Sequence, residues 1–463
     1  MSAERSANIP VCEKERGLSN PLYGRLENPP ACLEGDSGED RGMSDANLLI
    51  EPLPPGWKNH QFGDVCDRVK DPYQPVVDGD TPYVGLEHLA QGFPAFVGRG
   101  QESEVKSSKT AFKVGDILFG KLRPYLRKGA QADIDGVCST DILAFRAKAT
   151  CESGFLKFII HSDEFVAHAK STTSGVQHPR TSWPSLREFR LSLPPLPEQK
   201  KIAHILSTVQ RAIEAQERVI PTTTELKKAL MHKLFTEGLR NEPQKQTAIG
   251  LVPECWEVVE LVTLLREPLR NGHSAKATTD EDGIRTLTLT AVTQRDFSIE
   301  NTKVTCADPH RVRDMWLKSG DIFIERANTA DYVGLAALYE GDEDFAIFPD
   351  LLIRVRVDTG RILPKVLIEW LLAEPCRRYY KKNARSTAGN FPKIDQGTVE
   401  KTLLPVPPAD EQAELESSFR TLDDKLRQHT LRKAALQDLF RTLLHELMTA
   451  KTRVANIDLA NAT

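Results

Sequence analysis

Two kinds of hydrophobic pattern run along the chain, and each of them occurs twice. In residues 51–195 and again in 250–406, short runs rich in Val, Ile, Leu and Thr are broken by Gly, Pro and Asp, which is typical of strands. After each of these regions, apolar residues recur at alternating steps of four and three, which is typical of a helix that packs against another helix. The pattern therefore predicts a mixed α/β chain in which a globular domain is followed by a long helix, twice over.

The two long helical segments also repeat each other in sequence, at an offset of 213 residues. PPLPEQ at 194–199 returns as PPADEQ at 407–412, and LMHKLFT at 230–236 lies over LLHELMT at 443–449. Because loops accumulate insertions, a long ungapped match indicates one rigid element in each half of the chain. At a rise of about 1.5 Å per residue, such a helix forms a rod of roughly 50 Å.

The heptad pattern of the two segments defines a seam that is apolar at its ends and polar in the middle. We expect the two helices to pair antiparallel as a coiled coil, with polar pairing in the central stretch setting their register. The alternative is that each helix packs only on its own domain. Pro221 is expected to kink the first helix or to break its hydrogen-bond ladder locally. The apolar seam positions are Ile202, Leu206, Val209, Ile213, Leu230 and Leu234 in the first segment and Phe419, Leu422, Leu426, Leu443 and Leu447 in the second.

Changes in composition mark the boundaries between these regions. Residues 1–50 contain NPP, EGDSGED and few apolar positions, so they are predicted to be disordered. The complete prediction is a disordered N-terminal tail at 1–50, a first globular domain at 51–195, a first spacer helix at 196–240, a second globular domain at 250–406, a second spacer helix at 407–452 and a disordered tail at 453–463.

The composition predicts a cytoplasmic protein without a membrane partner. Hydrophobic residues make up 40% and charged residues 27%, as in ordinary globular proteins. The apolar runs are too short to span a bilayer, and the eight cysteines have neither paired nor zinc-ligand spacing. The net charge of −4 is dominated by residues 1–52, where ten acidic and five basic side chains leave −5. Overall charge thus neither demands nor excludes nucleic acid, and local patches have to decide.

Several motifs approach the pattern of a catalytic or nucleotide site without completing it. GDILFGK at 115–121 matches GxxxxGK, but Leu122 stands where a phosphate-binding loop needs Ser or Thr for magnesium. NPP at 28–30 is similar to the adenine-holding motif of amino-methyltransferases, but Ala31 replaces the aromatic residue that stacks on the base. We therefore predict no catalytic residue and no metal ligand in this chain.

Four segments combine basic side chains with small polar residues, and they form two pairs. LFGKLRPYLRKG at 118–129 and IERANTADYVG at 324–334 each leave a GDI strand, while STTSGVQHPR at 171–180 and RRYYKKNARSTAGNFPK at 377–393 are aligned with HPR over FPK. Arg and Lys neutralise phosphates, and Arg and Asn pair with guanine and adenine edges. Ordinary solvated turns are the alternative, which is less favoured because both halves share the pattern. The candidate DNA-contacting residues are Lys121, Arg123, Tyr125, Arg127, Lys128, Thr173, Ser174 and Arg180 in the first half and Arg326, Asn328, Thr329, Arg385, Ser386, Thr387 and Lys393 in the second.

These motifs together resemble a known family. PPLPEQKKIAHIL before a heptad helix, GDILFGKLRPYLRK, and STAGNFPKI before a second PPxxEQ are similar to the specificity subunit of type I restriction-modification systems. The resemblance covers residues 53–450, and the repeated PPxxEQ with its helix is the most distinctive part. The second copy departs from the first, since Ala409 and Asp410 replace Leu and Pro.

The resemblance implies two target-recognition domains, each of which reads one half of a split DNA sequence. It implies that the helices act as a ruler and as a docking surface for two modification subunits, which bind S-adenosylmethionine and methylate adenine. A separate restriction subunit would use ATP and Mg to translocate and cut DNA, while this chain binds no cofactor and is not catalytic by itself. Two other classes stay open: a coiled-coil scaffold joining two α/β modules without DNA, and a single-chain methyltransferase, which the incomplete motifs disfavour.

Overall fold

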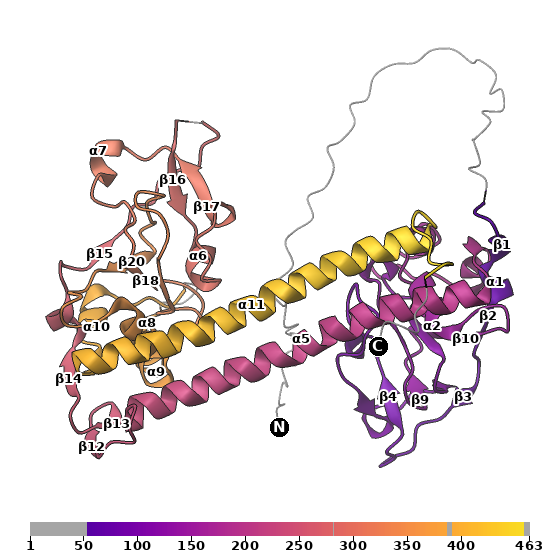
Figure 1. The fold of residues 1–463 in the computed structure, drawn as a ribbon, viewed down its shortest axis with the longest axis horizontal. Coiled ribbons are helices and arrows are strands. Elements are labelled where there is room, and N and C mark those ends of the chain that lie inside the picture. Colours follow the sequence, from indigo (N-terminus) through magenta and orange to yellow (C-terminus); the bar gives the residue numbers. More distant parts are fainter. Residues whose placement is uncertain (1–52, 281, 387–390, 458–463) are drawn as a thin grey trace, which may run out of the picture. The chain divides into compact units, whose positions relative to one another are not determined.

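The structure is a computed structural model that describes residues 53–280, 282–386 and 391–457 (Figure 1). The predicted disordered tail at 1–50 lies outside the described residues. In the part of the chain that is described, no helix combines the length and the apolar character needed to cross a membrane.

The first domain is built from small sheets with short helices packed on them. β1 (Lys58–Gln61) pairs antiparallel with β11 (Arg190–Leu193), so the first and last strands of the domain are neighbours. A four-stranded sheet has the order β2 (Cys66–Arg68), β10 (Ile142–Ala147), β7 (Ile117–Gly120), β8 (Gly129–Gln131), and a five-stranded sheet has the order β3 (Pro72–Tyr73), β6 (Lys109–Phe112), β9 (Gly136–Cys138), β4 (Pro82–Val84), β5 (Gly100–Gln101). The helices are α1 (Phe62–Val65), α2 (Ser153–Ile159), α3 (Asp163–Ser171) and α4 (Trp183–Leu186), with 3-10 turns η1 (Leu86–His88), η2 (Glu102–Glu104) and η3 (Pro124–Leu126).

The second domain repeats the central part of this plan. Its first and last strands, β14 (Glu257–Glu260) and β21 (Leu403–Val406), are again an antiparallel pair. Its four-stranded sheet has the order β15 (Arg270–Asn271), β20 (Leu352–Val355), β18 (Ile322–Glu325), β19 (Ala336–Leu338), and β16 (Ile284–Leu287) pairs with β17 (Thr302–Thr305). The helices are α6 (Leu289–Thr293), α7 (Pro309–Val312), α8 (Pro364–Leu372), α9 (Glu374–Asn383) and α10 (Gln396–Glu400), with 3-10 turns η4 (Leu261–Leu264) and η5 (Ile299–Asn301). A hairpin of β12 (Gln244–Thr247) and β13 (Gly250–Pro253) precedes the domain. The predicted mixed α/β class with an internal repeat is confirmed.

The repeated GDI motif forms the same buried turn at the start of β7 and of β18. The preceding glycines have φ angles of 88° and 93°, which favours glycine at both positions. Asp116 and Asp321 are buried and each accepts a main-chain N–H from three residues earlier. Each carboxylate also receives two hydrogen bonds from one guanidinium, that of Arg146 at 2.7 and 2.7 Å and that of Arg356 at 2.5 and 2.9 Å. The motif therefore anchors the strand that leads to each candidate loop.

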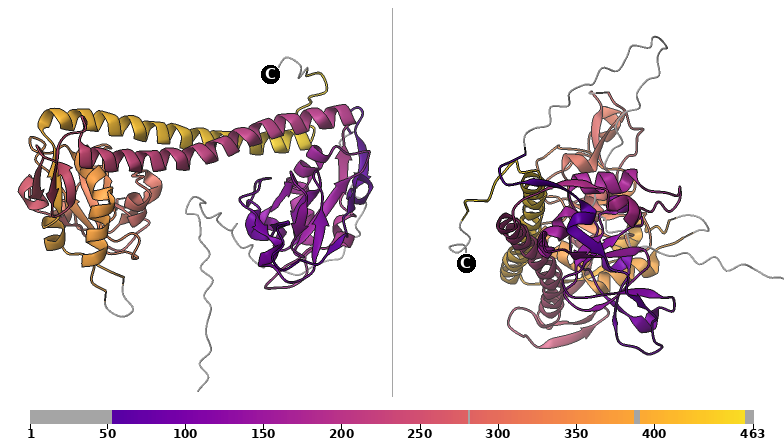
Figure 2. Two further views of the ribbon diagram at one scale, coloured as in Figure 1. Left: turned by 90° about the horizontal axis from the view of Figure 1, so that it is seen from below. Right: turned by 90° about the vertical axis from the view of Figure 1, so that its right-hand side faces the viewer.

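The long helical segments are two continuous helices, α5 (Leu196–Glu237) of 42 residues and α11 (Ala409–Met448) of 40 residues. They run in opposite directions and lie side by side (Figures 1 and 2). α5 continues as a helix through Pro221, which removes one ladder donor without ending the helix. All of the seam residues named above are buried or half-buried. The antiparallel coiled coil is confirmed, and the alternative in which each helix packs only on its own domain is wrong.

The centre of the crossing between α5 and α11 is polar. Nδ1 of His429 lies 2.8 Å from Oε1 of Gln216, and Nζ of Lys433 lies 2.9 Å from the carboxylate of Glu217. Gln216 and His429 are 213 residues apart, so two equivalent positions of the repeat contact each other. The pseudo-twofold axis of the repeat passes through this pair, and polar pairing at the centre of the seam is confirmed.

The glutamate of each PPxxEQ motif joins a domain to the start of its helix. Glu198 accepts a hydrogen bond from the indole N–H of Trp57 at 3.3 Å, and Glu411 accepts one from that of Trp256 at 2.8 Å. Each tryptophan belongs to the opening segment of its domain, and all four side chains are buried. The motif therefore fixes the first residues of a domain to the helix that follows its last strand.

The glutamine of each motif makes a second joint, this time to the main chain. The side-chain amide of Gln199 donates to the carbonyl oxygens of Pro194 and Thr150, and its oxygen accepts the N–H of Glu152 at 2.8 Å. Gln412 repeats all three bonds in the second half, where its oxygen lies 2.8 Å from the N–H that precedes α8. A buried amide with its hydrogen bonds made holds the helix at one angle to the domain.

On the side of the first domain, aromatic rings and one lysine make the contact with the helices. Phe440 of α11 is 3% exposed and packs against Phe93, with ring centroids 5.2 Å apart, and against Phe158 of α2 at 6.1 Å. Nζ of Lys157 in α2 donates to Oε1 of Gln210 in α5 at 2.8 Å. Burial lowers the pKa of Lys157 to about 8.

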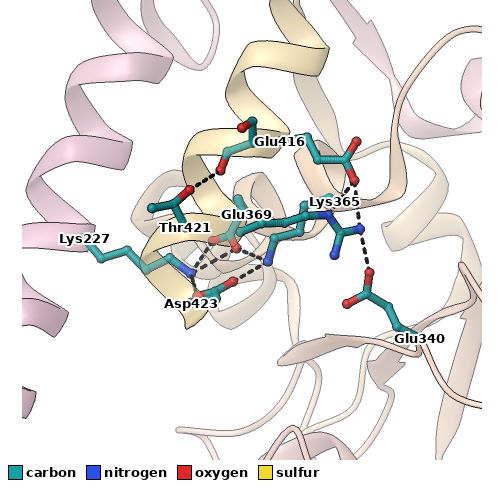
Figure 3. Close-up of polar contacts among 9 residues, drawn as sticks. Lys227, Glu340, Lys365, Glu369, Glu416, Thr421 and Asp423 are labelled. Carbon is teal, nitrogen blue, oxygen red and sulfur yellow. Dashed lines mark hydrogen bonds and ion pairs between the residues drawn. The ribbon is translucent and has the colours of Figure 1, made fainter. Parts of the chain in front are cut away.

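On the side of the second domain, four charged residues occupy the corresponding place (Figure 3). Lys227 of α5 lies 2.6 Å from Asp423 of α11 and 2.9 Å from Glu369 of α8. Lys365 of α8 lies 2.8 Å from Glu369 and also contacts Asp423. Burial alone would raise the pKa of Asp423, but hydrogen bonds from the two lysines outweigh it and hold this pKa below its ordinary value. We call these four residues the charge cluster; Lys227 and Phe440 are equivalent positions of the repeat.

The end of the chain packs on the start of the first domain. Arg453 donates to both carboxylate oxygens of Glu198 at 2.8 and 2.9 Å, and Val454 is 2% exposed within the core of the first domain. Nζ of Lys201 donates to the carbonyl oxygen of Ala455 at 2.7 Å. Arg453 and Val454 are thus packed and Ala455 is held by a hydrogen bond, whereas the sequence placed these residues in a disordered tail. The reason is that Arg453 neutralises a buried carboxylate. Residues 458–463 lie outside the described residues.

Candidate nucleic-acid interface

In the first domain, two of the candidate segments form one surface. The loop after β7 and the hairpin closed by Ser174 and Arg180 are joined by main-chain hydrogen bonds. The N–H of Arg123 donates to the carbonyl oxygen of Pro179 at 2.8 Å, and that of Thr181 donates to the carbonyl oxygen of Lys121 at 3.1 Å. The sequence treated these segments separately, and the fold places them side by side.

The second domain builds the same surface from equivalent residues. The N–H of Asn328 faces the carbonyl oxygen of Pro392 at 3.4 Å, and that of Ile394 donates to the carbonyl oxygen of Arg326 at 2.9 Å. The hairpin here is closed by Arg385 and Lys393, so it is two residues longer than in the first domain. We call the described residues of the loop and the hairpin of each domain its loop–hairpin surface: residues 121–128 with 174–180, and 326–329 with 385, 386 and 391–393.

Two of the predicted basic residues use their charge inside the first domain. Arg127 donates to the carboxylate of Asp163 at 2.5 Å and to the carbonyl oxygen of His161 at 3.3 Å. Nζ of Lys128 donates to the carbonyl oxygen of Leu86 at 2.6 Å, and burial lowers the pKa of Lys128. These contacts hold the loop after β7 against α3 and η1, which is a structural role.

Arg180 also makes an internal ion pair. Its guanidinium donates twice to the carboxylate of Asp141, at 2.8 and 3.2 Å, and this pairing lowers the pKa of Asp141. Because Arg180 closes the hairpin, the pair fixes the hairpin to the turn before β10. The sequence could not show this partner, which lies 39 residues away.

The other predicted residues of the first domain lie on the surface or at its edge. Arg123, Tyr125 and Ser174 are exposed, whereas Lys121 and Thr173 are half-buried. Arg123 has a φ angle of 50°, a left-handed conformation that turns the chain into η3. Its guanidinium reaches the carbonyl oxygen of residue 177 at 3.4 Å, so a cation lies beside the end of the hairpin.

In the second domain, a buried carboxylate supports the loop. Glu325 at the end of β18 is fully buried, and burial raises its pKa to about 7. It accepts hydrogen bonds from the amide of Asn328 and from the hydroxyl of Thr293. The oxygen of Asn328 accepts the N–H of Thr329 at 2.7 Å, and Arg326 donates to the loop that contains Asp350. Asn328 therefore shapes the turn.

Among the predicted and described residues of the second surface, Thr329, Arg385, Ser386 and Lys393 are exposed. Thr387 lies outside the described residues. Sequence reasoning passed over Val176, which is 100% exposed at the end of the first hairpin, and Phe391, which is 63% exposed in the second. The available signal was an apolar residue inside a polar loop between Gly and Pro.

Among the described residues, one group has the spacing of three metal ligands: Glu242, Cys255 and Glu411 lie within 4.8 Å of one another. The thiol of Cys255 lies 3.0 Å from the carboxylate of Glu242, and this hydrogen bond raises the pKa of Cys255 to about 11. Glu411 is already bonded to Trp256. The contacts account for the group as part of the joint between the second domain and α11.

Comparisons with known proteins agree with this architecture. Residues 54–221 match the family described as the type I restriction modification DNA specificity domain. The chain is 24% identical over 426 residues to the type I restriction enzyme MjaVIII specificity subunit of Methanocaldococcus jannaschii, covering 88% of this chain and 95% of the relative. It is 25% identical over 202 residues to the EcoDI specificity subunit of Escherichia coli, covering 42% and 44%.

A solved structure shows the same fold. The S subunit of the type I restriction-modification system from M. genitalium is similar with a TM-score of 0.55 and 15% identity, over 85% of this chain and 96% of that one. The family match lies on the first domain and α5, the match to the M. jannaschii relative runs through both halves, and the fold supplies the duplicated domain-and-helix unit. The resemblance of the chain to the specificity subunits of type I restriction-modification systems is thus confirmed in sequence, and the solved structure confirms the fold.

Proposed function

We propose that each domain of this chain reads one half of a bipartite DNA target through its loop–hairpin surface. The observation that carries the proposal is the duplication of that surface, with the same main-chain bonds in both domains, on domains that dock at opposite ends of one antiparallel helix pair. A scaffold without DNA needs neither the duplicated basic loops nor the exposed Arg123 and Lys393. As a specificity subunit, the chain supplies recognition and is the non-catalytic member of its complex.

The helix pair also has features of a docking surface. Leu226 of α5 and Leu439 of α11 are 60% and 45% exposed, although both lie within the coiled coil. They are equivalent positions of the repeat, so the pair presents the same apolar feature twice. We assign these two faces to two modification subunits, which would carry S-adenosylmethionine, while the restriction subunit would use ATP and Mg.

Binding of the complex to duplex DNA should weaken steeply with salt. The complex with modification subunits is titrated with a labelled duplex at several salt concentrations, and the slope of log affinity against log salt is measured. Each neutralised phosphate contributes about 0.9 to this slope. Arg123→Ala should reduce the slope by about 1, because its guanidinium is exposed beside the hairpin.

The matched control is Lys58→Ala, which removes an exposed cation of β1, outside the loop–hairpin surface, and should leave the slope unchanged. A flat slope for the unaltered complex would exclude phosphate contacts and with them the proposal.

The helix pair should set the gap between the two half-targets. Residues 213–219 and 426–432 face each other around Gln216 and His429, so deleting both segments removes one heptad while keeping the seam in phase. The pair then shortens by about 10 Å, which corresponds to roughly three base-pair steps. Sequencing of methylated adenines in the host should report a shorter gap between unchanged half-targets. A changed base preference with an unchanged gap would contradict the proposal that the helix pair sets the distance between the half-targets.

A further inference from the structure

We propose that the end of the first hairpin, Val176, Gln177 and His178, contacts base edges of the first half-target, and that Phe391 does so in the second domain. The proposal rests on the proposed function and goes beyond it, because it separates the residues that read bases from those that hold the loop or bind phosphate.

Each hairpin carries an exposed apolar side chain shortly before the Pro-and-base pair that closes it. Val176 is 100% exposed and lies three residues before Pro179, and Phe391 is 63% exposed and lies directly before Pro392. The two are not equivalent positions of the repeat, since Phe391 corresponds to His178. A single exposed apolar residue is ordinary, but an exposed apolar side chain in both hairpins indicates a surface that becomes covered in a complex.

The first hairpin is held rigidly by hydrogen bonds at its base. Ser174 and Arg180 exchange two main-chain hydrogen bonds of 2.9 Å, and Arg180 is fixed by its two bonds to Asp141. Gly175 has a φ angle of 91°, and a Cβ added there would lie 3.3 Å from the carbonyl oxygen of His178. The hairpin is thus held at both strands and at its first turn, which is the preorganisation that base contacts need.

A cation of the loop, Arg123, lies beside the hairpin. The guanidinium of Arg123 reaches the carbonyl oxygen of Gln177, so its charge lies beside the end of the hairpin. Arg127, Lys128 and Arg180 are occupied inside the domain. Arg123 is thus placed to contact a phosphate, while the apolar and amide side chains at the end of the hairpin contact bases in the adjacent groove.

The residues at the end of the hairpin have side chains that can contact bases. Apolar side chains contact the thymine methyl group, and the Gln amide pairs with adenine through two hydrogen bonds. The two domains differ here, since the second hairpin is two residues longer and places Phe391 where the first has His178. The two tips therefore select different bases, as two unlike half-targets require.

The test uses the complex with its modification subunits and the variants Val176→Ser, Gln177→Ala and His178→Ala. The control is Val114→Ser, a 62% exposed valine at the other end of β7 from the loop. Affinity is measured for a duplex that carries the sequence methylated in the host and for a scrambled duplex. Each tip variant should reduce the preference for the first half-target by about 5- to 100-fold, with an unchanged salt slope. Phe391→Ser should do the same for the second half-target only.

The outcomes separate the two proposals. If the unaltered complex shows a steep salt slope but no tip variant changes the preference between the duplexes, the assignment of the tip is overturned and the proposed function stands. If the unaltered complex shows no salt dependence, the proposed function itself fails. Since Val176 and Phe391 lie on the surface, the melting temperature of each variant should match that of the control. A lowered melting temperature in all four variants would mean that these residues stabilise the fold and would overturn their assignment to base contacts.

Discussion

Replacing Lys227 by Met is expected to lower the free energy of unfolding by about 3–5 kcal/mol. Lys227 is the cation shared by Glu369 and Asp423, and the side chains of Lys227 and Glu369 are 9% and 2% exposed. Without it, Lys365 alone faces both carboxylates, so the cluster keeps one uncompensated negative charge. The loss should appear as a lower midpoint in chemical denaturation of the full chain within its complex.

The same substitution should move acid unfolding to higher pH. In the folded protein the pKa of Asp423 is held below its ordinary value, so this carboxylate contributes stability above its unfolded pKa and loses that contribution as pH falls through the folded one. With one of its two lysine donors removed, the pKa of Asp423 rises. The pH range in which the ionised carboxylate stabilises the folded protein therefore becomes narrower. Lys228→Met is the matched control, because its side chain is 67% exposed and pairs only with Glu225. Equal midpoints for the two variants would show that the charge cluster does not stabilise the docking of the second domain.

Phe440→Ala should cost about 3–5 kcal/mol through a different mechanism. Phe440 is 3% exposed and fills the space between Phe93 and Phe158, so truncation leaves a cavity where the first domain meets α11. Unlike Lys227→Met, this change removes no charge, so its effect should not grow as the pH falls from neutral toward the acid range in which Asp423 titrates. Denaturation midpoints measured from neutral to acid pH report both properties.

Leu431→Ala is the control for the cavity, since Leu431 lies in the same helix and is 60% exposed. It should stay within about 0.5 kcal/mol of the unaltered protein. A cost for Phe440→Ala as small as that of Leu431→Ala would mean that the first domain does not depend on this contact. Lys227 and Phe440 are equivalent positions of the repeat. Lys227 makes its contact through ion pairs, and Phe440 makes its contact through aromatic rings.

The parts of the fold that have a period were predictable from the sequence. The heptad exposed the coiled coil and its polar centre, because a helix places residues at steps of three and four on one face. The duplicated GDI and PPxxEQ motifs located the same turn and joint in both halves. The roles of Glu198 and Gln199 in these motifs were not visible in the sequence. Their partners are Trp57, at the start of the domain, and the main chain of Glu152, directly before α2.

The candidate site was predictable as segments but not as side chains. Residues 121–128 were predicted as a basic segment from their composition. Two of its cations, Arg127 and Lys128, are bound within the domain because Asp163 and the carbonyl oxygen of Leu86 lie within reach in the fold. The charge cluster draws on α5, α8 and α11, so no local pattern marks it. The packing of Arg453 on Glu198 joins residues 255 positions apart and was likewise hidden.

That last contact has a consequence for the order in which the protein can be completed during synthesis. The core of the first domain includes Phe440, Leu444, Leu447 and Val454, and Arg453 reaches the carbonyl oxygen of Pro55, 398 residues earlier. When residues 53–195 have left the ribosome, the apolar face of the first domain is therefore not yet covered by α11 and the residues that follow it. Closure waits until nearly the whole chain has emerged, so the first domain to be made is the one that stays open longest and is most exposed to aggregation or to a chaperone.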